Sequence, residues 1–537
     1  MLDSLEDEIP SEVLERYHLP TLKTALVWIH TPKKESDALA ARKRFAFEEI
    51  FFIQLEKQKN RAQWQKEKGF VIEPDKNTFN DFVSRFPFPL TGAQKKSIDH
   101  VLADFKNGHP MSRLLEGDVG SGKTAVAATS TFVVTTSTPK GQNFGNLQTA
   151  YMVPTEILAQ QHFESFIQYF THTGISIGLI TGSGCRKFPS KVDPKGWTSV
   201  SRAQLLKWVA NGEIPILIGT HALIQKSVKF KHLAYVVIDE QHRFGTAQRQ
   251  SLAQKEGVTP HLLSMTATPI PRTLALTLYG DLDLSLLDEM PAGRKPIVTE
   301  IMLSNQREVA YDKVRAELKV GRQAYVICPR INEPDPTKET AILAKSVTEE
   351  AKRLQKDIFP EYTIGILHSK MTPAQKEKVM NEFKEGNITI LVATSVVEVG
   401  VNVPNATVII IEGGERFGLA QLHQLRGRVL RSNHQPFCFV FSESNSEKSV
   451  ERLKALKKAL NGFELAEFDL QQRGSGELYG GKQWGVSDLA MEAIKNLKMV
   501  EAAREESKTI IEADPELREH PLLKKHMEEN LKKIHFE

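Results

Sequence analysis

The chain has 537 residues, of which 40% are hydrophobic and 25% charged, and its formal net charge is +4. This length predicts about three to five domains. No apolar run is long enough for a membrane span, the acidic start lacks a secretory h-region, and three scattered cysteines exclude a disulfide framework or a zinc site. We therefore expect a cytoplasmic multidomain protein with no membrane partner, and the slight basic excess leaves a nucleic-acid partner undecided.

The first predicted element is helical. Residues 17–68 are rich in charge and carry apolar residues at helix-like spacing, so we interpret residues 1–75 as a helical arm or linker. The basic run of Arg42, Lys43 and Arg44 has two interpretations: a contact with a nucleic-acid backbone, or a solvated helix face. The second is favoured, because most charge runs are solvated.

Short β-rich runs alternate with helical stretches over residues 76–292. Several are apolar nearly throughout: SRLLEGD, TAYMVPT, IPILIGT, LAYVVIDE and HLLSMTAT. Apolar runs between helices are typical of buried parallel strands, so we predict an α/β domain here. The polar, glycine-containing stretch 135–147 is expected to be a surface loop.

The same pattern restarts after DEMPAGRKPI. The new apolar runs are QAYVICPR, YTIGILHS, ITILVATS, ATVIIIEGG and PFCFVFS. They predict a second α/β domain over residues 293–445, joined to the first near Pro291 to Pro296. Beyond it the strand signal stops, and glycine-interrupted helical sequence predicts a smaller helical module over residues 446–537.

A phosphate-binding loop is predicted between the first strand and the helix that follows. GDVGSGKT fits G-x-x-x-x-G-K-[ST], whose glycines let backbone N–H groups turn toward phosphate oxygens at a helix N-terminus. The lysine ammonium would neutralise the β- and γ-phosphates of ATP, and the threonine hydroxyl would ligate Mg²⁺. The residues expected at the nucleotide are Gly117, Asp118, Val119, Gly120, Ser121, Gly122, Lys123 and Thr124.

A second part of the ATP site is predicted at YVVIDEQH. An apolar strand delivers Asp239 and Glu240 at its C-terminal end, where ligands of parallel sheets bind. Asp239 would hold Mg²⁺ through water, and Glu240 would orient and deprotonate the attacking water. Gln241 and His242 are expected beside them. An Asp-Glu pair after a strand is commonplace, but its place after a phosphate loop favours the catalytic interpretation.

At IDEQHRFG and SMTATPIPRTLALTLYGDLDLSLLDEMPAGRKPI the sequence resembles superfamily 2 helicases, and specifically the RecG family of ATP-dependent DNA helicases. The resemblance runs from about Leu19 through nearly the whole chain. It implies an α/β fold of two RecA-like parallel-sheet lobes in tandem, with an N-terminal helical arm and a C-terminal helical hairpin module. It also implies that the family's N-terminal wedge domain is lacking, because the sequence begins just before the arm.

The resemblance also assigns residues to the nucleotide and to DNA. Phe88 and Gln94 match the adenine-reading Q motif in FPFPLTGAQ. Other hydroxyl, amide and charged residues match motifs that face DNA or couple DNA to ATP, and such groups bind phosphates without reading bases. These residues are Pro154, Thr155, Thr181, Gly182, Thr220, His221, Ser264, Thr266, Thr268, Thr394, Glu398, Gly400, Arg473 and Gln483.

QLHQLRGRVLRS resembles motif VI, in which Gln424, Arg428 and Arg431 would reach across the cleft between the lobes to stabilise charge on the transferred phosphoryl group. Leu430 stands where the family has glycine. The C-terminal stretch around Arg473 resembles the family's translocation motif, with Ser475, Lys482 and Trp484 as departures.

The function that the resemblance implies is an ATP-dependent helicase or translocase on duplex and branched DNA, such as stalled forks and recombination junctions, in DNA repair and recombination. Binding would be sequence-independent, and the protein a bacterial-type, nucleoid-associated monomer. Two alternatives remain open. One is a transcription-repair type of duplex translocase, and the other is an interaction protein that uses ATP as a switch without translocation.

Overall fold

The computed structural model describes residues 5–142, 144–240, 258–268, 270–291, 293–329, 346–394, 403–430, 432–444, 446–472 and 493–534. The chain folds into two compact units. The helical unit combines Met1–Lys68, Ile270–Leu284 and Glu467–Glu537, and the two-lobe unit combines Gly69–Pro269 and Ser285–Ala466.

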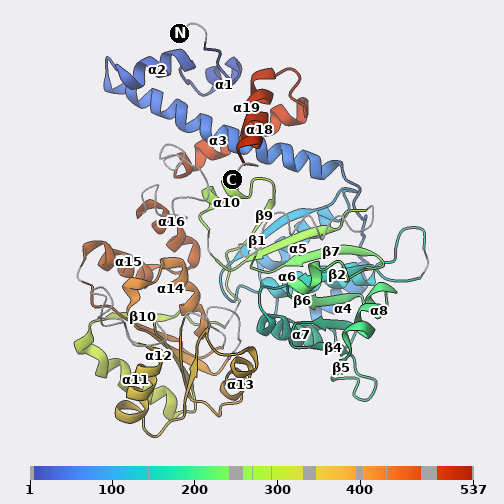
Figure 1. The fold of residues 1–537 in the computed structure, drawn as a ribbon, viewed down its shortest axis with the longest axis vertical. Helices are drawn as coiled ribbons and strands as arrows, with labels where there is room; N and C mark the ends of the chain where they lie inside the picture. Colours follow the sequence, from blue (N-terminus) through green and yellow to red (C-terminus); the bar gives the residue numbers. More distant parts are fainter. Residues whose placement is uncertain are drawn as a thin grey trace. The chain divides into compact units, whose positions relative to one another are not determined.

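The first lobe is built on a nine-stranded sheet of order β5-β4-β3-β6-β2-β7-β8-β1-β9 (Figure 1). Its strands are β1 (Ser112–Gly117), β2 (Gln148–Met152), β3 (Ile177–Ile180), β4 (Cys185–Phe188), β5 (Thr198–Val200), β6 (Ile216–Gly219), β7 (Leu233–Ile238), β8 (His261–Thr266) and β9 (Asp283–Leu287). The apolar runs of the first predicted domain are confirmed as β1, β2, β6, β7 and β8, which form the continuous parallel centre of this sheet. Strands β4 and β5 extend one side of it as an antiparallel hairpin.

The helices of the first lobe are α4 (Lys76–Ser84), α5 (Gly92–Asp104), α6 (Lys123–Thr136), α7 (Glu156–Phe170), α8 (Arg202–Ala210) and the 3-10 turn η2 (His221–Ile224). Helix α6 is buried along nearly its whole length, from Ala125 to Thr135. A helix without a polar face has to lie inside a domain, which anchors the loop that precedes α6. The expected surface loop over 135–147 begins two residues too early, because Thr135 and Thr136 still belong to α6 and Thr135 is fully buried; the segment after them connects α6 to β2, and its Phe144 is exposed.

The second lobe has a six-stranded sheet of order β10-β15-β14-β11-β13-β12 in which the registered pairs are all parallel. Its strands are β10 (Val298–Met302), β11 (Gln323–Ile327), β12 (Ile364–Leu367), β13 (Ile390–Ala393), β14 (Ala406–Ile411) and β15 (Phe437–Phe441). Its helices include α11 (Arg307–Lys319), α12 (Val347–Arg353), α13 (Pro373–Lys384), α14 (Leu419–Arg426) and α15 (Glu447–Lys458). The second set of predicted strands is confirmed as β11 to β15.

The helical unit joins segments that lie far apart in the sequence. Its helices are α1 (Ser11–Arg16), α2 (Leu22–His30), α3 (Glu35–Lys66), α10 (Arg272–Leu278), α18 (Leu497–Ala513) and α19 (Pro521–Ile534), and Figure 1 shows α18 beside α3. Phe47 and Phe51 of α3 share one core with Leu274 of α10 and with Val500 and Ile511 of α18. The predicted arm and the predicted C-terminal module therefore bury their apolar faces against each other.

One residue of the basic run on α3 is buried in this unit, while Arg42 and Lys43 are exposed, as expected for a solvated helix face. Arg44 is fully buried, and it forms ion pairs with Asp7, at 2.6 Å, and with Glu48. Lys43 donates a hydrogen bond to the carbonyl oxygen of Tyr17 at 3.0 Å. Both interpretations from the sequence are therefore wrong for Arg44, because a guanidinium with no exposed surface is neither solvated nor open to a nucleic acid.

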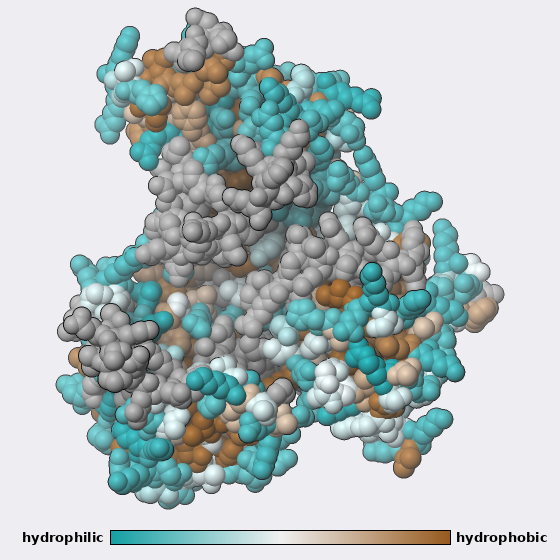
Figure 2. Space-filling model, in the orientation of Figure 1, coloured by the Kyte–Doolittle hydropathy of each residue, from teal (hydrophilic) through white to brown (hydrophobic). Residues whose placement is uncertain are grey.

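No helix among the described ranges is long and apolar enough to cross a membrane. Figure 2 shows hydrophilic side chains over much of the visible face, with hydrophobic residues in small groups between them. Scattered apolar residues of this kind are ordinary on protein surfaces and need no partner to cover them.

Candidate nucleotide site and interlobe contacts

The predicted phosphate loop lies between β1 and the buried helix α6. Gly120 and Gly122 have φ angles of +81° and +88°, in the left-handed region that glycine adopts at little cost. A Cβ atom at Gly117 would lie 2.6 Å from Oγ of Ser121 and 2.7 Å from Cβ of Leu287. The three glycines thus stand where the turn or the packing admits no ordinary side chain, and the loop leads directly into the N-terminus of α6.

The polar groups of this loop fit a phosphate chain. The Nζ of Lys123 donates hydrogen bonds to the carbonyl oxygens of Gly117, at 2.7 Å, and Asp118, at 3.0 Å. Oγ of Ser121 is buried and has no hydrogen-bond partner in the described part of the chain. An ammonium and an unsatisfied hydroxyl beside a helix N-terminus are groups that phosphate oxygens can satisfy.

Asp239 follows β7 and is held by a polar network. Oδ2 of Asp239 lies 3.0 Å from Nε2 of His162, and Nδ1 of His162 lies 3.3 Å from the hydroxyl of Tyr151, which also contacts the Thr124 hydroxyl. An ionised Asp239 carboxylate has only acceptor oxygens, so Nε2 of His162 carries the proton and donates to it. Burial raises the pKa of Tyr151 well above its ordinary value, so this phenol keeps its proton and can donate to Nδ1 of His162.

The same network keeps Asp239 ionised. Burial alone would raise the pKa of this carboxyl, but the hydrogen bond from His162 and the positive charge of Lys123 outweigh it and hold the pKa below its usual range. A carboxylate and the Thr124 hydroxyl are oxygen ligands of the kind that Mg²⁺ takes in nucleotide sites. The residues present therefore fit Mg²⁺ beside the phosphates, where the ion supplies charge neutralisation.

Glu240 has φ of +55°, a left-handed conformation that is uncommon for a residue with a Cβ atom. Its backbone N–H donates to Oδ1 of Asp239 at 3.0 Å. Backbone strain of this kind costs of order 1–3 kcal/mol and clusters at functional sites. Gln241 and His242 lie outside the described residues.

One of the two expected adenine-reading residues, Gln94, lies against the phosphate loop. Oε1 of Gln94 accepts from the N–H of Thr91 at 2.9 Å, and its Nε2 donates to the carbonyl of Ser121 at 2.7 Å. Gln94 is fully buried, and a Cβ atom at Gly122 would lie 2.1 Å from its Nε2. Gln94 thus supports the phosphate loop here, while Phe88 packs partly buried against the core. Their contact with an adenine stays a prediction.

Three expected DNA-facing motifs lie at one edge of the first sheet. Pro154 and Thr155 follow β2, Thr181 follows β3, and Thr220 follows β6, and these strands are parallel neighbours in the order β3-β6-β2. Because the carboxyl ends of parallel strands meet at the same edge, the residues after them lie along it. His221 follows Thr220 and begins η2.

Local hydrogen bonds connect these motifs. Oγ1 of Thr155 accepts from the N–H of Leu158 as the N-cap of α7. The N–H of Gly182 donates to Oε1 of Glu156 at 2.9 Å, which joins the loop after β3 to the start of α7. Oγ1 of Thr181 donates to the carbonyl of Gly184 at 2.9 Å. The motifs after β2 and β3, which the sequence predicts separately, are therefore joined by a hydrogen bond.

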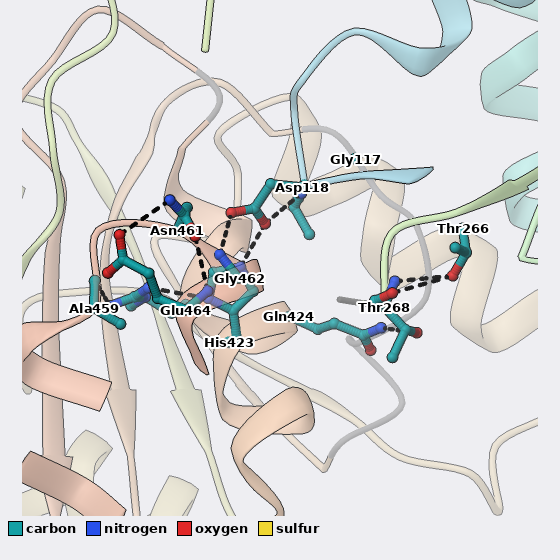
Figure 3. Close-up of polar contacts among 12 residues, drawn as sticks. Gly117, Asp118, Thr266, Thr268, His423, Gln424, Ala459, Asn461, Gly462 and Glu464 are labelled. Atoms are coloured by element: carbon teal, nitrogen blue, oxygen red, sulfur yellow. Dashed lines mark hydrogen bonds and ion pairs between the residues drawn. The ribbon is translucent and has the colours of Figure 1, made fainter. Parts of the chain in front are cut away.

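The hydroxyl-rich turn after β8 reaches the second lobe. Oγ1 of Thr266 accepts from the N–H of Thr268 at 3.1 Å, and Nε2 of Gln424 donates to Oγ1 of Thr268 at 2.7 Å (Figure 3). Ser264 is buried in β8, and its Oγ has no hydrogen-bond partner among the residues described. Gln424 lies on α14, so the hydroxyl-rich turn of the first lobe and motif VI of the second lobe are in direct contact.

Two further residues of motif VI, Arg428 and Leu430, are buried just after α14. Arg428 is 6% exposed, within the 3-10 turn Gly427–Val429. Leu430 has φ of −87°, which every L-residue adopts readily, and is 9% exposed, so this position accommodates leucine without backbone strain. Thr394 follows β13 and is buried. Five further expected residues lie outside the described ranges: Glu398, Gly400, Arg431, Arg473 and Gln483.

Sequence reasoning missed three side chains of this region: His162, His423 and Arg294. Nε2 of His423 contacts Oδ1 of Asp118 in the phosphate loop, and a guanidinium nitrogen of Arg294 donates to the carbonyl of Gly120 at 2.6 Å. A single histidine in a helical stretch of sequence is most simply interpreted as a core residue. The available signal for His423 and Arg294 was their place inside motif VI and inside the GRKPI stretch.

Two parallel-sheet lobes, with the phosphate loop of the first in contact with the motif VI helix of the second, define the motor core of a superfamily 2 helicase. Family models match this order along the chain. The DEAD/DEAH box helicase model matches residues 91–277, and the helicase conserved C-terminal domain matches residues 308–433. The model of ATP-dependent DNA helicase RecG, domain 3, C-terminal, matches residues 459–536.

The chain is 42% identical to the ATP-dependent DNA helicase RecG of Bacillus subtilis, over 95% of this chain and 71% of the relative. It is also 42% identical to RecG of Synechocystis sp., over 97% of this chain and 60% of that relative. A solved structure of RecG bound to a three-way DNA junction is 38% identical, with a TM-score of 0.72, and the match covers 93% of this chain and 62% of that one. The chain therefore belongs to the RecG family of ATP-dependent DNA helicases, and it spans about 60% of the length of the Synechocystis relative.

Proposed function

We propose that this chain is an ATP-hydrolysing motor that translocates on duplex DNA and acts on branched DNA, such as stalled forks and recombination junctions. The observation that carries the proposal is the contact between Gln424 and Thr268 at 2.7 Å, which ties the motif VI helix of the second lobe to the turn after β8 in the first. Membership of the RecG family supports the choice of DNA as the track.

In the proposed cycle, Lys123 leaves the two loop carbonyls and pairs with the β- and γ-phosphates of ATP. Asp239, kept ionised by His162, would hold Mg²⁺ together with Thr124, and the ion would neutralise phosphate charge. Glu240 orients and deprotonates the attacking water. Arg428 stabilises the charge on the transferred phosphoryl group, as an arginine from a neighbouring lobe does at about 10³ to 10⁵ in rate in related enzymes.

DNA would bind along the edge formed by Thr155, Gly182 and Thr220. Hydroxyl and backbone N–H groups bind phosphate oxygens without reading bases, so binding should be sequence-independent and should weaken as salt rises. Opening and closing of the lobes would then alternate the grip on one strand. We further propose that the protein works as a monomer on nucleoid DNA.

Two related functions compete with this one. An ATP switch without translocation would not need Glu240 in a strained conformation beside the ionised Asp239, a pairing suited to hydrolysis. A transcription-repair type of translocase uses the same motor, and binding of an RNA polymerase would identify it.

The direct experiment is the ATPase rate with forked, linear duplex and single-stranded DNA of matched nucleotide content. We expect stimulation by forked and duplex DNA above single-stranded DNA, equal for unrelated sequences, and declining with salt. A rate that none of the three DNAs changes would reject the proposed function and favour the ATP switch.

A further inference from the structure

We propose that Asp118 and His423 form a positioning pair that couples nucleotide occupancy of the phosphate loop to helix α16 (Gly462–Gln472). The inference rests on the proposed function, because it assigns a route by which ATP binding would reach the C-terminal part of the motor. In sequence, α16 ends one residue before Arg473.

Asp118 is the centre of this arrangement (Figure 3). Its side chain is 7% exposed, and Oδ1 accepts from the N–H of Val119 at 2.7 Å and from Nε2 of His423. Oδ2 accepts from the backbone N–H of Gly462 at 3.0 Å. A buried carboxylate is costly unless it is paired and hydrogen-bonded, and here both of its oxygens are bonded. One side chain of the phosphate loop thus contacts both α14, which precedes β15 in the chain, and the start of α16, which follows it.

His423 is fixed in the orientation that this contact needs. A guanidinium nitrogen of Arg426 lies 3.0 Å from Nδ1 of His423. Arginine has only donors, so Nδ1 is the acceptor and the ring proton lies on Nε2, directed at Asp118. His423 and Arg426 are 2% and 4% exposed, so water does not compete for these bonds.

Arg426 also forms hydrogen bonds with the C-terminal end of α15. Its other terminal nitrogen donates to the carbonyl oxygens of Leu456, at 2.8 Å, and Ala459, at 3.4 Å. These carbonyls lie at the C-terminus of α15, the negative end of the helix dipole, which favours a cation. The turn between α15 and α16 is therefore held on one side by Arg426 and on the other by Asp118.

The N-terminus of α16 is held by its own capping residues and by Asp118. Asn461 caps it by accepting from the N–H of Glu464 at 2.9 Å, and the Glu464 carboxylate accepts from the N–H of Leu460 at 3.0 Å. The N–H of Gly462 has no acceptor within its own helix, as in the first turn of any helix, and Asp118 supplies one. The first turn of α16 is thus completed by a residue of the phosphate loop.

The same residue is bonded to the nucleotide-sensing lysine. The carbonyl oxygen of Asp118 accepts from Nζ of Lys123 at 3.0 Å, and that of Gly117 accepts from the same atom at 2.7 Å. When ATP phosphates attract Nζ of Lys123, the carbonyl oxygens of Gly117 and Asp118 lose their hydrogen bonds to it. The backbone at Asp118 then shifts, and the Asp118 side chain that binds His423 and Gly462 shifts with it. Nucleotide binding and the position of α16 are thereby linked through one residue.

The first test measures translocation per ATP in variants at His423, by displacement of a triplex-forming strand from duplex DNA. His423→Leu removes both ring nitrogens, whereas His423→Gln keeps an N–H donor toward Asp118. His434→Leu, at an exposed histidine of the same lobe, is the matched control. We expect His423→Leu to lower base pairs moved per ATP at least fivefold, with His423→Gln recovering at least half and the control unchanged. Equal values for His423→Leu and the control would overturn the proposal.

The second test needs no substitution, so a folding defect cannot obscure it. Hydrogen exchange of a peptide that begins several residues before Gly462 and covers the first turn of α16 is compared in the unmodified chain with and without a non-hydrolysable ATP analogue and Mg²⁺. We expect the exchange rate of this peptide to change at least threefold. No change, with the analogue shown to be bound, would overturn the coupling even if DNA stimulates ATPase normally. Absence of DNA stimulation, with the exchange shift present, would instead reject the proposed function.

Discussion

The contact between Gln424 and Thr268 makes a quantitative prediction about the two lobes. Thr268→Val keeps the shape of the side chain and removes the hydroxyl, while Gln424→Ala removes the donor. The bond is short and neutral, at 2.7 Å, and Gln424 is 7% exposed. A neutral hydrogen bond contributes about 0.5–1.5 kcal/mol net, so we expect an interaction energy of about 1 kcal/mol, or roughly fivefold in rate.

The assay is a double-mutant cycle on kcat/KM for DNA-stimulated ATP hydrolysis. Each single variant should lower kcat/KM, and the double variant should be no worse than the more damaging single variant, because one bond is lost in all three. If the bond stabilises the closed state in which ATP is hydrolysed, its loss should lower kcat and leave KM nearly unchanged. Additive effects, with an interaction energy below about 0.3 kcal/mol, would refute the inference that these residues act together.

Three further predictions concern the nucleotide site and motif VI. Lys123→Ala should abolish ATP turnover, and Glu240→Gln should bind ATP but hydrolyse it at least about 100-fold more slowly; near-normal turnover by steady-state ATPase would contradict the site. Because the pKa of Asp239 is depressed in the folded chain, its stabilising contribution is present above about pH 4 and lost as pH falls through the folded value. Urea midpoints of the unmodified chain and Asp239→Asn should converge toward acid pH, and parallel curves would count against this. Leu430→Gly should lower stability by about 2–5 kcal/mol, measured by denaturant unfolding, since leucine is buried there without strain. An unchanged midpoint would show that this side chain is not packed.

The central strands of each sheet could be predicted because most of them are largely apolar runs in the sequence. Strands such as β7 and β14 are buried on both faces, so their sequences are apolar without interruption. Strands β5 and β10 contain exposed or half-exposed positions and lie at sheet edges, so their sequences lack this signal. The phosphate loop was predictable for a similar reason, since its chemistry requires glycine and lysine at fixed spacing.

What the sequence did not reveal depends on contacts between distant segments. The helical unit forms because α3 and α18 share a core across more than four hundred residues, as in the bond from Ser507 to the carbonyl of Phe51, which are 456 positions apart. The partners of Asp118 and Asp239 are histidines 305 and 77 positions away. Nothing in the local pattern around a single histidine identifies its partner. Arg44 was misread for the same reason, since its acidic partner Asp7 lies 37 positions earlier, ahead of α1.

The central claim, that ATP hydrolysis drives movement along DNA, is tested most directly by displacement of a triplex-forming strand at increasing distances along a linear duplex. With ATP and Mg²⁺, the account predicts displacement after a lag that lengthens with distance, and no displacement by Lys123→Ala or with a non-hydrolysable ATP analogue. Hydrolysis that DNA stimulates without displacing the third strand, or displacement that occurs equally with the analogue, would contradict it.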